Sequence, residues 1–313
     1  MIFLNASEVI SDLRRQDVEI LTEKRLEEVI EEIPRPVTYI GLEPSNSLHI
    51  GNLSASIPVM KLAKHGFRAI ILLADLHALA NDKGEIEEIR RYAKFDKAMY
   101  EKIASKMGIG GKLEYKHGTE FEDQEYFMQL LRLAKHVNLT EAEKAMDEIS
   151  KASVTAMTSS IIYPLMQALD IGVLGVNVAV GAMDQRKVHV LAIENLKRLG
   201  YRTPVAIHGP IMLGTDGKKK MSKSEGNAIF LNETEDSLEA KIKKTYCAPG
   251  DVEINPILSW YRAMIFPLSD SAIEFGAKKA NEYKDLEAMW KEGRTTPQEL
   301  KRSAKRDLGK LIL

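Results

Sequence analysis

The sequence predicts an α/β protein with a parallel sheet, followed by a smaller helical region. A strand-like run at Val37–Leu42 precedes a helical pattern at about 48–65, and the apolar run 69–74 follows. That last run lacks the alternation of a half-exposed strand, which is typical of a strand buried on both faces. Strand, helix and strand in this order indicate a parallel βαβ unit. A mostly helical pattern from about residue 233 to the end predicts the second region.

The N-terminal stretch, residues 5–33, has the pattern of two short charged helices. Asn5 or Ser7 is the candidate N-cap of the first helix, and Thr22 is the candidate N-cap of the second. The sequence Pro-Arg-Pro at 34–36 then ends the helical pattern.

The elements after the first βαβ unit also alternate between helix and strand. Helical patterns are expected at about 85–107 and 123–160, a strand at 113–116, and helix, strand, helix and strand between about 159 and 212. The charged helical stretch interrupts the strand order, so we interpret it as an insertion. We therefore predict N-terminal helices at 1–35, a sheet domain at 36–227 with an insertion at about 115–160, and a linker with a helical domain at 228–313.

The bulk composition is that of an ordinary soluble protein with one large and one smaller domain. The chain has 313 residues, is 44% hydrophobic and 28% charged, and has a net charge of −1. Because there is no overall basic charge, any contact with nucleic acid depends on local patches. The single cysteine, Cys247, excludes an intrachain disulfide and fits a reducing cytoplasm. We expect neither a signal peptide nor a membrane-spanning segment.

The first candidate site is His49, at a turn from strand to helix. A helix N-terminus presents unpaired N–H groups and the positive end of the helix dipole, which favour phosphate. Gly41 and Gly51 allow a nucleotide to approach the backbone closely. An imidazole here can donate to phosphate oxygens as their charge grows during a reaction. The alternative is a histidine that caps its own helix, and the spacing does not decide between the two.

The second candidate is the loop at 214–227, GTDGKKKMSKSEGN, which follows a predicted strand. Glycines on both sides of a lysine cluster make a mobile loop, and Lys220 and Lys223 can close on a polyphosphate as point charges. The sequence does not fit the G-x-x-x-x-G-K-[ST] pattern of a P-loop. For most lysine clusters the alternative, a solvated basic loop, is correct.

Two further candidates follow the insertion. In YPLMQALD, with Pro164 expected in the first turn of a helix, Tyr163, Gln167 and Asp170 share one helix face. Three polar groups converging there can hold a small polar molecule, although a polar face in water is the more common arrangement. In GAMDQRK, at the carboxyl end of an apolar strand, the pair 184–185 stands where open parallel sheets bind ligands.

Two of these segments together resemble the signatures of the class I aminoacyl-tRNA synthetases. HIGN, at 49–52, resembles the HIGH signature of that class. The sequence at 220–224 matches the second signature of the class, KMSKS, letter for letter. The blocks YIGLEPS, LLADLHA, YPLMQALD and VGAMDQRK resemble the tyrosyl-tRNA synthetases of the archaeal and eukaryotic type, from about residue 5 to near the C-terminus. Tryptophanyl relatives usually lack an aspartate at the position of Asp170. The resemblance implies a Rossmann-type catalytic domain with a connective insertion and a helical anticodon-binding domain.

The resemblance also implies a role for each matching residue. For L-tyrosine, Tyr39 and Asp170 bind the phenolic hydroxyl, Tyr163, Gln167 and Gln185 hold the α-amino group, and His77 lines the pocket. For ATP, the implied residues are Gly41, His49, Gly51, Asp184, Lys220, Met221, Ser222, Lys223 and Ser224. His49, Asn52, Lys220 and Lys223 are implied to stabilise the transition state.

The implied reaction activates tyrosine with ATP and transfers it to the 3′ end of tRNA(Tyr). ATP is a substrate, Mg²⁺ accompanies it, and the protein itself holds no metal. The expected assembly is a cytoplasmic homodimer whose contacts come largely from the insertion, and neither DNA nor a membrane is an expected partner.

The sequence departs from the family pattern at four positions. Asn52 replaces the second histidine of HIGH, and an amide can still donate to a phosphate oxygen. Asn177 stands where the family usually has aspartate and Ala182 where it usually has glycine, and we expect both close to the pocket wall. Glu299 stands where archaeal relatives carry an aspartate that contacts the anticodon. These changes keep three alternatives open: a paralogue that makes an aminoacyl-adenylate for another acceptor, a tryptophanyl enzyme, and a non-catalytic RNA-binding protein on the same fold.

Overall fold

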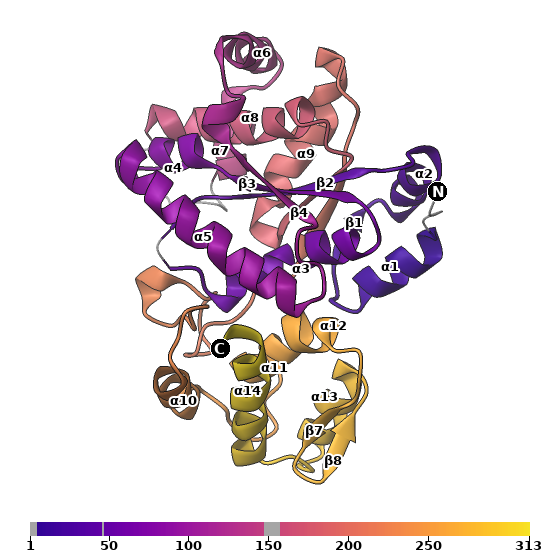
Figure 1. The fold of residues 1–313 in the computed structure, drawn as a ribbon, viewed down its shortest axis with the longest axis vertical. Helices are drawn as coiled ribbons and strands as arrows, with labels where there is room; N and C mark the ends of the chain where they lie inside the picture. Colours follow the sequence, from indigo (N-terminus) through magenta and orange to yellow (C-terminus); the bar gives the residue numbers. More distant parts are fainter. Residues whose placement is uncertain (1–4, 46, 147–156) are drawn as a thin grey trace. The chain divides into compact units, whose positions relative to one another are not determined.

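The computed structural model describes residues 5–45, 47–146 and 157–313, and the chain divides into two compact units (Figure 1). The first unit comprises residues 1–11, 18–46 and 58–209, and the second comprises residues 12–17, 47–57 and 210–313. The segment with His49 therefore groups with the C-terminal unit, and the predicted 36–227 domain contributes residues to both units. Among the described residues, no helix combines the length and the apolar character that crossing a membrane requires.

The first unit contains a six-stranded sheet with the order β1-β6-β5-β2-β3-β4. Its strands are β1 (Glu19–Leu21), β2 (Val37–Leu42), β3 (Arg68–Leu73), β4 (Leu113–His117), β5 (Val178–Ala182) and β6 (Val205–Gly209). β1 is antiparallel to β6, and the other neighbours are parallel. The predicted α/β class with a parallel sheet is confirmed.

Helices connect and cover these strands. They are α1 (Ala6–Arg14), α2 (Glu23–Glu32), α3 (Ile50–Lys64), α4 (Asp75–Ala80), α5 (Ile86–Lys106), α6 (Gln124–Ala134), α7 (Leu139–Met146), α8 (Thr158–Val173) and α9 (Arg186–Asn195). The side chains of Asn5 and Thr22 accept hydrogen bonds from the backbone N–H groups of Glu8 and Arg25, so both predicted N-caps form. Ser7, the other candidate for the first cap, lies inside α1.

β1 is an element that the sequence pattern did not predict. It is three residues long, lies between the two predicted helices, and pairs Glu19 with His208 of β6. A strand this short shows too little alternation to be recognised, and its polar first residue looks like part of a charged helix.

One face of the sheet is packed against α6, α8 and α9. Tyr39, Ile70 and Leu72 from the strands contact apolar residues of these helices, including Leu133 and Leu169, in one buried cluster. Burial of this cluster contributes favourably to the stability of the first unit.

The predicted position of Pro164 in the first turn of its helix is wrong. α8 begins at Thr158, so Pro164 lies inside the helix. The apolar residues before Tyr163 extend the helix in the N-terminal direction, and the missing N–H costs one intrahelical bond that burial of the following residues offsets. The predicted charged helix over 123–160 is two helices, α6 and α7, and residues 147–156 of that prediction lie outside the described residues.

The second unit is helical, with one hairpin. Its elements after residue 209 are α10 (Glu235–Lys244), α11 (Pro256–Trp260), a π-helical turn (Tyr261–Ile265), α12 (Phe266–Leu268), β7 (Ile273–Phe275), β8 (Lys278–Ala280), α13 (Tyr283–Lys291) and α14 (Pro297–Ile312). The β7–β8 hairpin was not predicted, because its strands are only three residues long.

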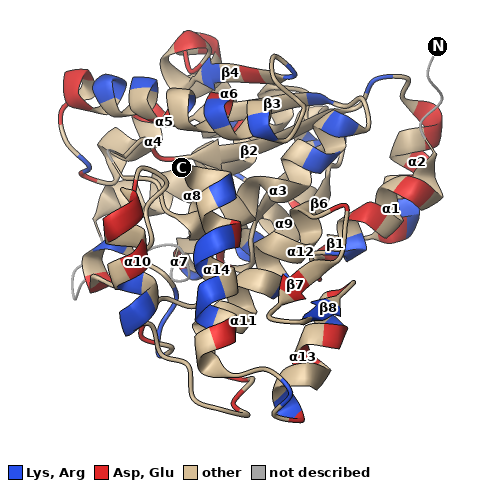
Figure 2. Cartoon of the chain, turned by 60° about the horizontal axis from the view of Figure 1, so that its bottom comes forward, with Lys and Arg blue, Asp and Glu red and all other residues tan. Residues whose placement is uncertain are grey.

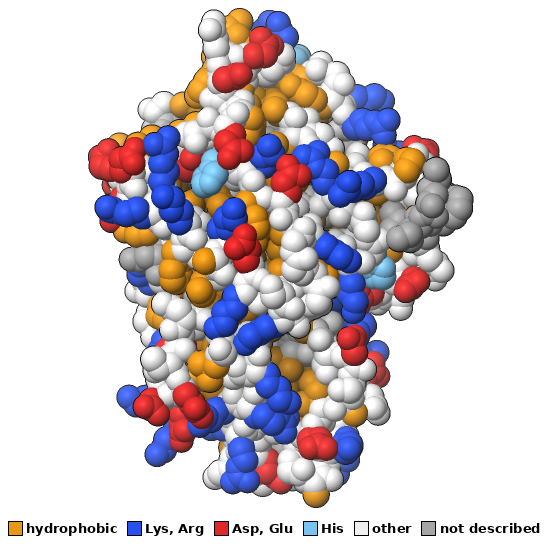
Figure 3. All heavy atoms as spheres, viewed as in Figure 1, with side chains coloured by type: hydrophobic (Ala, Val, Ile, Leu, Met, Phe, Trp, Pro, Cys, Tyr) orange, Lys and Arg blue, Asp and Glu red, His pale blue; other side chains and the backbone are white. Residues whose placement is uncertain are grey.

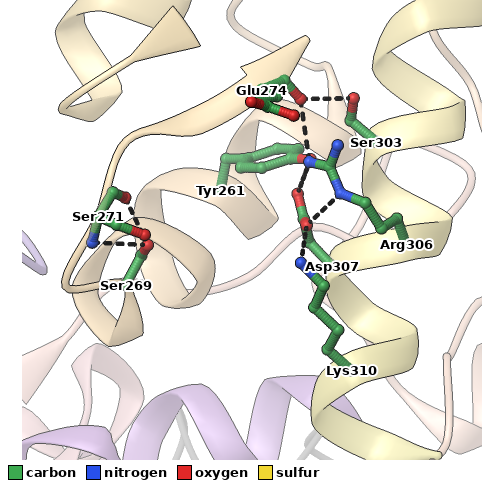
Figure 4. A network of polar contacts seen from close by, with 8 residues as sticks. All are labelled: Tyr261, Ser269, Ser271, Glu274, Ser303, Arg306, Asp307 and Lys310. Carbon is green, nitrogen blue, oxygen red and sulfur yellow. Dashed lines mark hydrogen bonds and ion pairs between the residues drawn. The ribbon is translucent and has the colours of Figure 1, made fainter. Parts of the chain in front are cut away.

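A polar network fastens the hairpin to α14 (Figure 4). The hydroxyl of the buried Tyr261 donates to Asp307 Oδ2 at 2.9 Å. Arg306 pairs with the same carboxylate and donates to the backbone oxygen of Glu274 in β7 at 2.9 Å, and Ser303 donates to that oxygen at 3.0 Å. Strand and helix are therefore joined through one carbonyl that has two donors.

Glu299, predicted to contact the anticodon, lies in the first turn of α14. Its carboxylate accepts hydrogen bonds from the backbone N–H (2.8 Å) and hydroxyl (3.0 Å) of Thr296, while the Thr296 hydroxyl accepts from the Glu299 N–H. This is a capping box. Both contacts from Thr296 are made to Oε2, while Oε1 lies 3.9 Å from Lys278 Nζ.

Glu299→Ala is expected to lower the free energy of unfolding by about 1 kcal/mol, because it removes half of a capping box. Urea denaturation followed by tryptophan fluorescence measures this directly, since both tryptophans, Trp260 and Trp290, lie in the second unit. The matched control is Gln298→Ala, an exposed neighbour in the same turn. Equal midpoints for the two variants would contradict a structural role of Glu299.

Candidate functional site

Five of the predicted tyrosine-binding residues lie in the first unit and form one buried cluster. Tyr39 comes from β2, Tyr163, Gln167 and Asp170 come from α8, and Gln185 ends a short 3-10 turn directly after β5. Gln167 Nε2 donates to Gln185 Oε1 at 3.0 Å, so α8 and the end of β5 meet through these two amides. Gln167 Oε1 is buried without a hydrogen-bond partner and is available to accept.

His77, in α4, belongs to the same cluster. Its Nε2 lies 3.5 Å from Asp170 Oδ2, and its ring meets the edge of the Tyr163 ring with centroids 4.8 Å apart. Burial lowers the pKa of His77 to about 4, so its imidazole is neutral near pH 7. The helix spacing of Tyr163, Gln167 and Asp170 correctly brought three polar groups to one place, but they face a buried interior and not water.

Two residues of this cluster were missed from the sequence. Tyr126, in α6, donates its hydroxyl to Asp170 Oδ1 at 2.7 Å, and Glu122, just before α6, has both carboxylate oxygens buried without a hydrogen-bond partner. The signal for Tyr126 was its spacing with Leu130 and Leu133 on one helix face, but the stretch was interpreted as a charged insertion. Glu122 had no signal, because a glutamate before a helix N-cap is ordinarily exposed.

The electrostatics of the cluster follow from its burial. Burial raises the pKa of Asp170 well above its usual value, and the neighbouring Glu122 carboxyl raises it further. Burial likewise raises the pKa of Tyr39, with the Asp170 charge adding to the effect. Asp170 Oδ2 and the Tyr39 hydroxyl have no hydrogen-bond partner. The cluster is therefore suited to a polar ligand that donates a hydrogen bond to Asp170 and accepts one from Tyr39.

Gly41 and Asp184 were predicted to face ATP. A Cβ at position 41 would lie 3.2 Å from the Tyr39 hydroxyl, so the glycine also leaves room for the Tyr39 ring. Asp184 Oδ1 accepts from Gln185 Nε2 at 3.2 Å, which links this carboxylate to the amide pair described above.

In the second unit, the HIGN segment begins α3 and is hydrogen-bonded to the chain that follows KMSKS. The N–H of Ile50 donates to the oxygen of Ile229 at 2.9 Å, and that of Leu231 donates to Leu48 at 2.8 Å. The backbone N–H of His49 donates to Asn52 Oδ1 at 3.0 Å, so Asn52 caps the turn. The two signatures, far apart in sequence, are thus held together by backbone pairing.

Gly51 determines where the His49 ring lies. A Cβ at position 51 would lie 2.9 Å from His49 Nδ1 and 3.6 Å from Met221 Cβ, so a larger residue would displace the imidazole. Burial, assisted by the charge of Lys220, lowers the pKa of His49 to about 4. The ring is therefore neutral near pH 7 and acts as a hydrogen-bond donor rather than a cation.

The 214–227 loop is ordered by Asn227, a residue that the sequence analysis did not single out. Its Oδ1 accepts from the N–H of Ser222 at 2.9 Å, and its Nδ2 donates to Asp216 Oδ1 at 3.2 Å. A Cβ at Gly214 would lie 2.2 Å from Asn227 Cγ, so only glycine fits there. Lys220 and Lys223 are exposed on this loop, and the hydroxyls of Ser222 and Ser224 lie 3.0 Å apart.

Comparison with known proteins decides the family. Residues 34–312 match the family of class I tRNA synthetases for tryptophan and tyrosine. The tyrosine–tRNA ligase of Methanosarcina mazei is 39% identical over 308 residues, covering 96% of each chain. The chain belongs to the class I tyrosyl and tryptophanyl tRNA synthetases.

Solved structures of synthetases agree with this assignment. The crystal structure of tyrosyl-tRNA synthetase with L-tyrosine from Archaeoglobus fulgidus superposes with a TM-score of 0.91 at 38% identity, covering 98% of each chain. The tryptophanyl-tRNA synthetase of Aeropyrum pernix is similar with a TM-score of 0.73 at 20% identity, which shows a shared fold only. The predicted tyrosyl family is confirmed.

Two residues at which this synthetase departs from its family lie at opposite ends of β5. Asn177, expected near the pocket wall, instead accepts from the N–H of Val37 at 2.8 Å and so sits at the amino ends of β2 and β5. Its side chain joins two strands and does not approach the cluster around Asp170. Ala182, in contrast, is the last residue of β5 and directly precedes the turn with Asp184 and Gln185.

A second polar network of the synthetase involves the buried residues His189 and His208. His208 Nδ1 lies 2.9 Å from Glu19 Oε2, His208 Nε2 lies 3.0 Å from His189 Nδ1, and Arg186 holds the Glu19 carboxylate at 2.9–3.0 Å. Burial, with the charge of His208, lowers the pKa of His189 to about 3. The network joins β1, β6 and α9 inside the first unit.

Acid is expected to destabilise the synthetase through His189. The folded state favours its neutral form, so this contribution is complete above the unfolded pKa of about 6.5 and is lost as the pH falls toward 3. Between pH 7 and 4.5 the loss is about 2–3 kcal/mol. In urea denaturation at the two pH values, His189→Gln is expected to lose less stability than the parent chain, and the exposed His136→Gln to lose as much. A parent-like loss in His189→Gln would show that this group does not contribute.

Proposed function

We propose that this chain is a tyrosine–tRNA ligase that forms tyrosyl-adenylate and transfers tyrosine to tRNA(Tyr). The observation that carries the proposal is that Asp170 Oδ2, an acceptor, and the Tyr39 hydroxyl, a donor, are both buried without hydrogen-bond partners in this cluster. A phenolic hydroxyl satisfies both groups, whereas phenylalanine leaves both unpaired. Identity of 36–39% to curated tyrosine–tRNA ligases over almost the whole chain supports the same substrate.

The α-amino group of tyrosine is proposed to bind beside Gln167 and Gln185. Gln167 Oε1 is a buried acceptor without a partner, and Gln167 Nε2 donates to Gln185 Oε1. Tyr163 lies beside His77 and forms part of the wall. An ammonium group has three donors and no acceptor, so an amide oxygen is a suitable partner.

Activation requires positioning and charge neutralisation rather than a protein nucleophile. The tyrosine carboxylate attacks the α-phosphorus of ATP, and pyrophosphate leaves. Lys220 and Lys223 neutralise charge on the phosphates, and His49 and Asn52 donate to phosphate oxygens at the start of α3. Gly41, Gly51, Asp184, Met221, Ser222 and Ser224 shape the surroundings of ATP. In the second step the terminal ribose hydroxyl of the tRNA attacks the tyrosyl carbonyl, and AMP leaves.

Mg²⁺ enters with ATP as part of the substrate and is coordinated by phosphate oxygens. Around the HIGN and KMSKS segments, the described residues form no cluster of three metal-ligating side chains. The lysines there suit phosphate rather than a cation, so the ion depends on ATP for its ligands.

We propose a homodimer in the cytoplasm, assembled through α6, α7 and the start of α8. Large apolar side chains are exposed on these helices: Phe127, Met128, Leu131, Leu139 and Ile162, with Leu131 65% exposed. Figure 3 shows hydrophobic side chains gathered at its top, where Figure 1 places α6. Several large apolar side chains exposed on neighbouring segments are typical of a protein–protein interface.

Residues 228–313 are proposed to bind the anticodon stem of the tRNA. Lysines and arginines follow one another along α10 and α14 (Figure 2). Lys301 Nζ donates to the oxygen of Lys243 at 2.8 Å, so the two basic helices lie side by side. Such a surface can contact phosphates, with Glu299 Oε1 as the candidate base acceptor.

Transfer of labelled tyrosine to total archaeal tRNA tests the second step. The proposal predicts charging that requires ATP and that excess unlabelled tyrosine abolishes. Formation of tyrosyl-adenylate without charging would identify a paralogue that serves another acceptor.

A further inference from the structure

The buried cluster contains more unpartnered polar atoms than the hydroxyl of tyrosine can satisfy. His77 Nδ1 and Nε2, both oxygens of Glu122, Asp170 Oδ2 and the Tyr39 hydroxyl all lack hydrogen-bond partners. A phenolic hydroxyl has one hydrogen and two lone pairs. Once that hydrogen goes to Asp170 and a lone pair to Tyr39, no donor remains for Glu122.

Glu122 is held in place at the edge of this cluster. Its side chain is 0% exposed, and a Cβ at Gly118 would lie 2.3 Å from its Oε1 and 2.8 Å from Asp75 Oδ1. Asp75 is already satisfied by the N–H (3.1 Å) and hydroxyl (2.7 Å) of Thr119. Glu122, in contrast, is a buried carboxyl of the cluster that accepts no hydrogen bond.

His77 lies between the two carboxyls. Its Nδ1 is 3.9 Å from Glu122 Oε1, and its Nε2 is 3.5 Å from Asp170 Oδ2. Both distances exceed a hydrogen bond, so the imidazole does not satisfy either group. A carboxyl oxygen of Glu122 and one of Asp170 lie within 4.8 Å of one another, a separation that two adjacent donors on an aromatic ring can span.

We propose that the pocket selects a tyrosine carrying a second hydrogen-bond donor, a hydroxyl or amino group, beside its phenolic hydroxyl. Asp170 binds the first group and Glu122 the second. Burying a carboxyl that accepts no hydrogen bond raises the free energy of the complex, and a second donor on the substrate would remove this penalty. This inference rests on the proposed adenylate-forming function and narrows its substrate class.

The same residues do not suit a metal ion. Ligand atoms of His77, Glu122 and Asp170 lie within 4.8 Å of one another, whereas those of a tetrahedral site lie about 3.4 Å apart. Asp170 Oδ1 is also occupied by Tyr126.

Amino-acid-dependent ATP–pyrophosphate exchange tests the inference with four substrates: tyrosine, 3-hydroxytyrosine, 3-aminotyrosine and 3-methyltyrosine. The methyl analogue has a similar size but no donor. We expect kcat/KM for the hydroxy or amino analogue to equal or exceed that for tyrosine. We expect kcat/KM for the methyl analogue to be about 10- to 100-fold below that for the hydroxy analogue, because the buried Glu122 carboxyl is then left without a partner. If tyrosine supports exchange and kcat/KM is lower for every analogue than for tyrosine, the inference is wrong but the proposed function stands. If no substrate supports exchange, the proposed function is wrong.

The variant Glu122→Gln assigns the effect to the carboxyl. The ratio of kcat/KM for 3-hydroxytyrosine to that for tyrosine is expected to fall about 10-fold or more in this variant. The control Glu120→Gln, exposed in the turn just before it, leaves the ratio unchanged. An unchanged ratio in Glu122→Gln would show that Glu122 does not bind the second donor and would overturn the inference. Stoichiometric Zn²⁺ binding by titration calorimetry, lost in Glu122→Gln, would identify a metal site and also overturn the inference.

Discussion

Replacing Asp170 by alanine is expected to lower kcat/KM for tyrosine on the order of 10³-fold or more, while phenylalanine is affected far less. The carboxylate is buried, and its Oδ2 is without a partner in the described cluster. In the proposed function this carboxylate accepts from the substrate hydroxyl, which would otherwise be unpaired in the buried cluster. Tyrosyl enzymes reject phenylalanine by about 10⁵-fold, a magnitude that is taken from this enzyme class and not calculated from the structure.

A second variant, Tyr126→Phe, distinguishes the effect of the Asp170 carboxylate itself from that of the hydrogen bond that holds it in place. Loss of the 2.7 Å hydrogen bond to Asp170 Oδ1 is expected to cost about 10-fold in kcat/KM for tyrosine, because the carboxylate remains but is less well held. Both variants are measured by pyrophosphate exchange with tyrosine and phenylalanine. If Asp170→Ala reduced both substrates equally, the carboxylate would be structural and the assignment of specificity wrong.

Lys220→Ala is expected to lower kcat of exchange by about 10²- to 10³-fold with little change in KM for tyrosine. A cation aimed at phosphate oxygens acts where charge develops, so its loss affects the transition state more than substrate binding. Lys220 lies on the loop that Asn227 orders, and its charge lowers the pKa of His49, which shows that the two side chains interact.

The control for this prediction is Lys218→Ala, a lysine on the same loop that is also exposed. It removes the same charge from the same loop and is expected to change kcat less than twofold. If the two variants lost activity equally, the loop would act only through its net charge, and the specific role of Lys220 would be wrong.

The parts of the site that could be predicted from sequence are those fixed by local spacing. Tyr163, Gln167 and Asp170 stand at helix intervals, so their convergence follows from the geometry of α8 alone. The βαβ pattern likewise placed Gln185 at the carboxyl end of a strand, where the pocket forms. Thr22 was recognisable as a cap because capping depends on neighbouring residues.

The remaining features depend on tertiary contacts that leave no local pattern. Tyr126 and Glu122 reach Asp170 and His77 from a segment that looks like a charged insertion. Glu19 looks like a helical surface residue, yet it pairs with His208, 189 positions away in the chain. Asn227 orders a loop that composition alone would leave mobile. In each case a polar residue that the sequence pattern would place at the surface makes contacts with residues distant in the chain instead.

Tyrosine-dependent ATP–pyrophosphate exchange, run in parallel with tyrosine, phenylalanine and tryptophan, tests the central claim most directly. If the enzyme forms an adenylate and recognises the phenolic hydroxyl, tyrosine supports exchange, and kcat/KM for phenylalanine and for tryptophan is lower by at least about 10³-fold. Comparable exchange with phenylalanine or tryptophan, or no exchange with tyrosine, would contradict it.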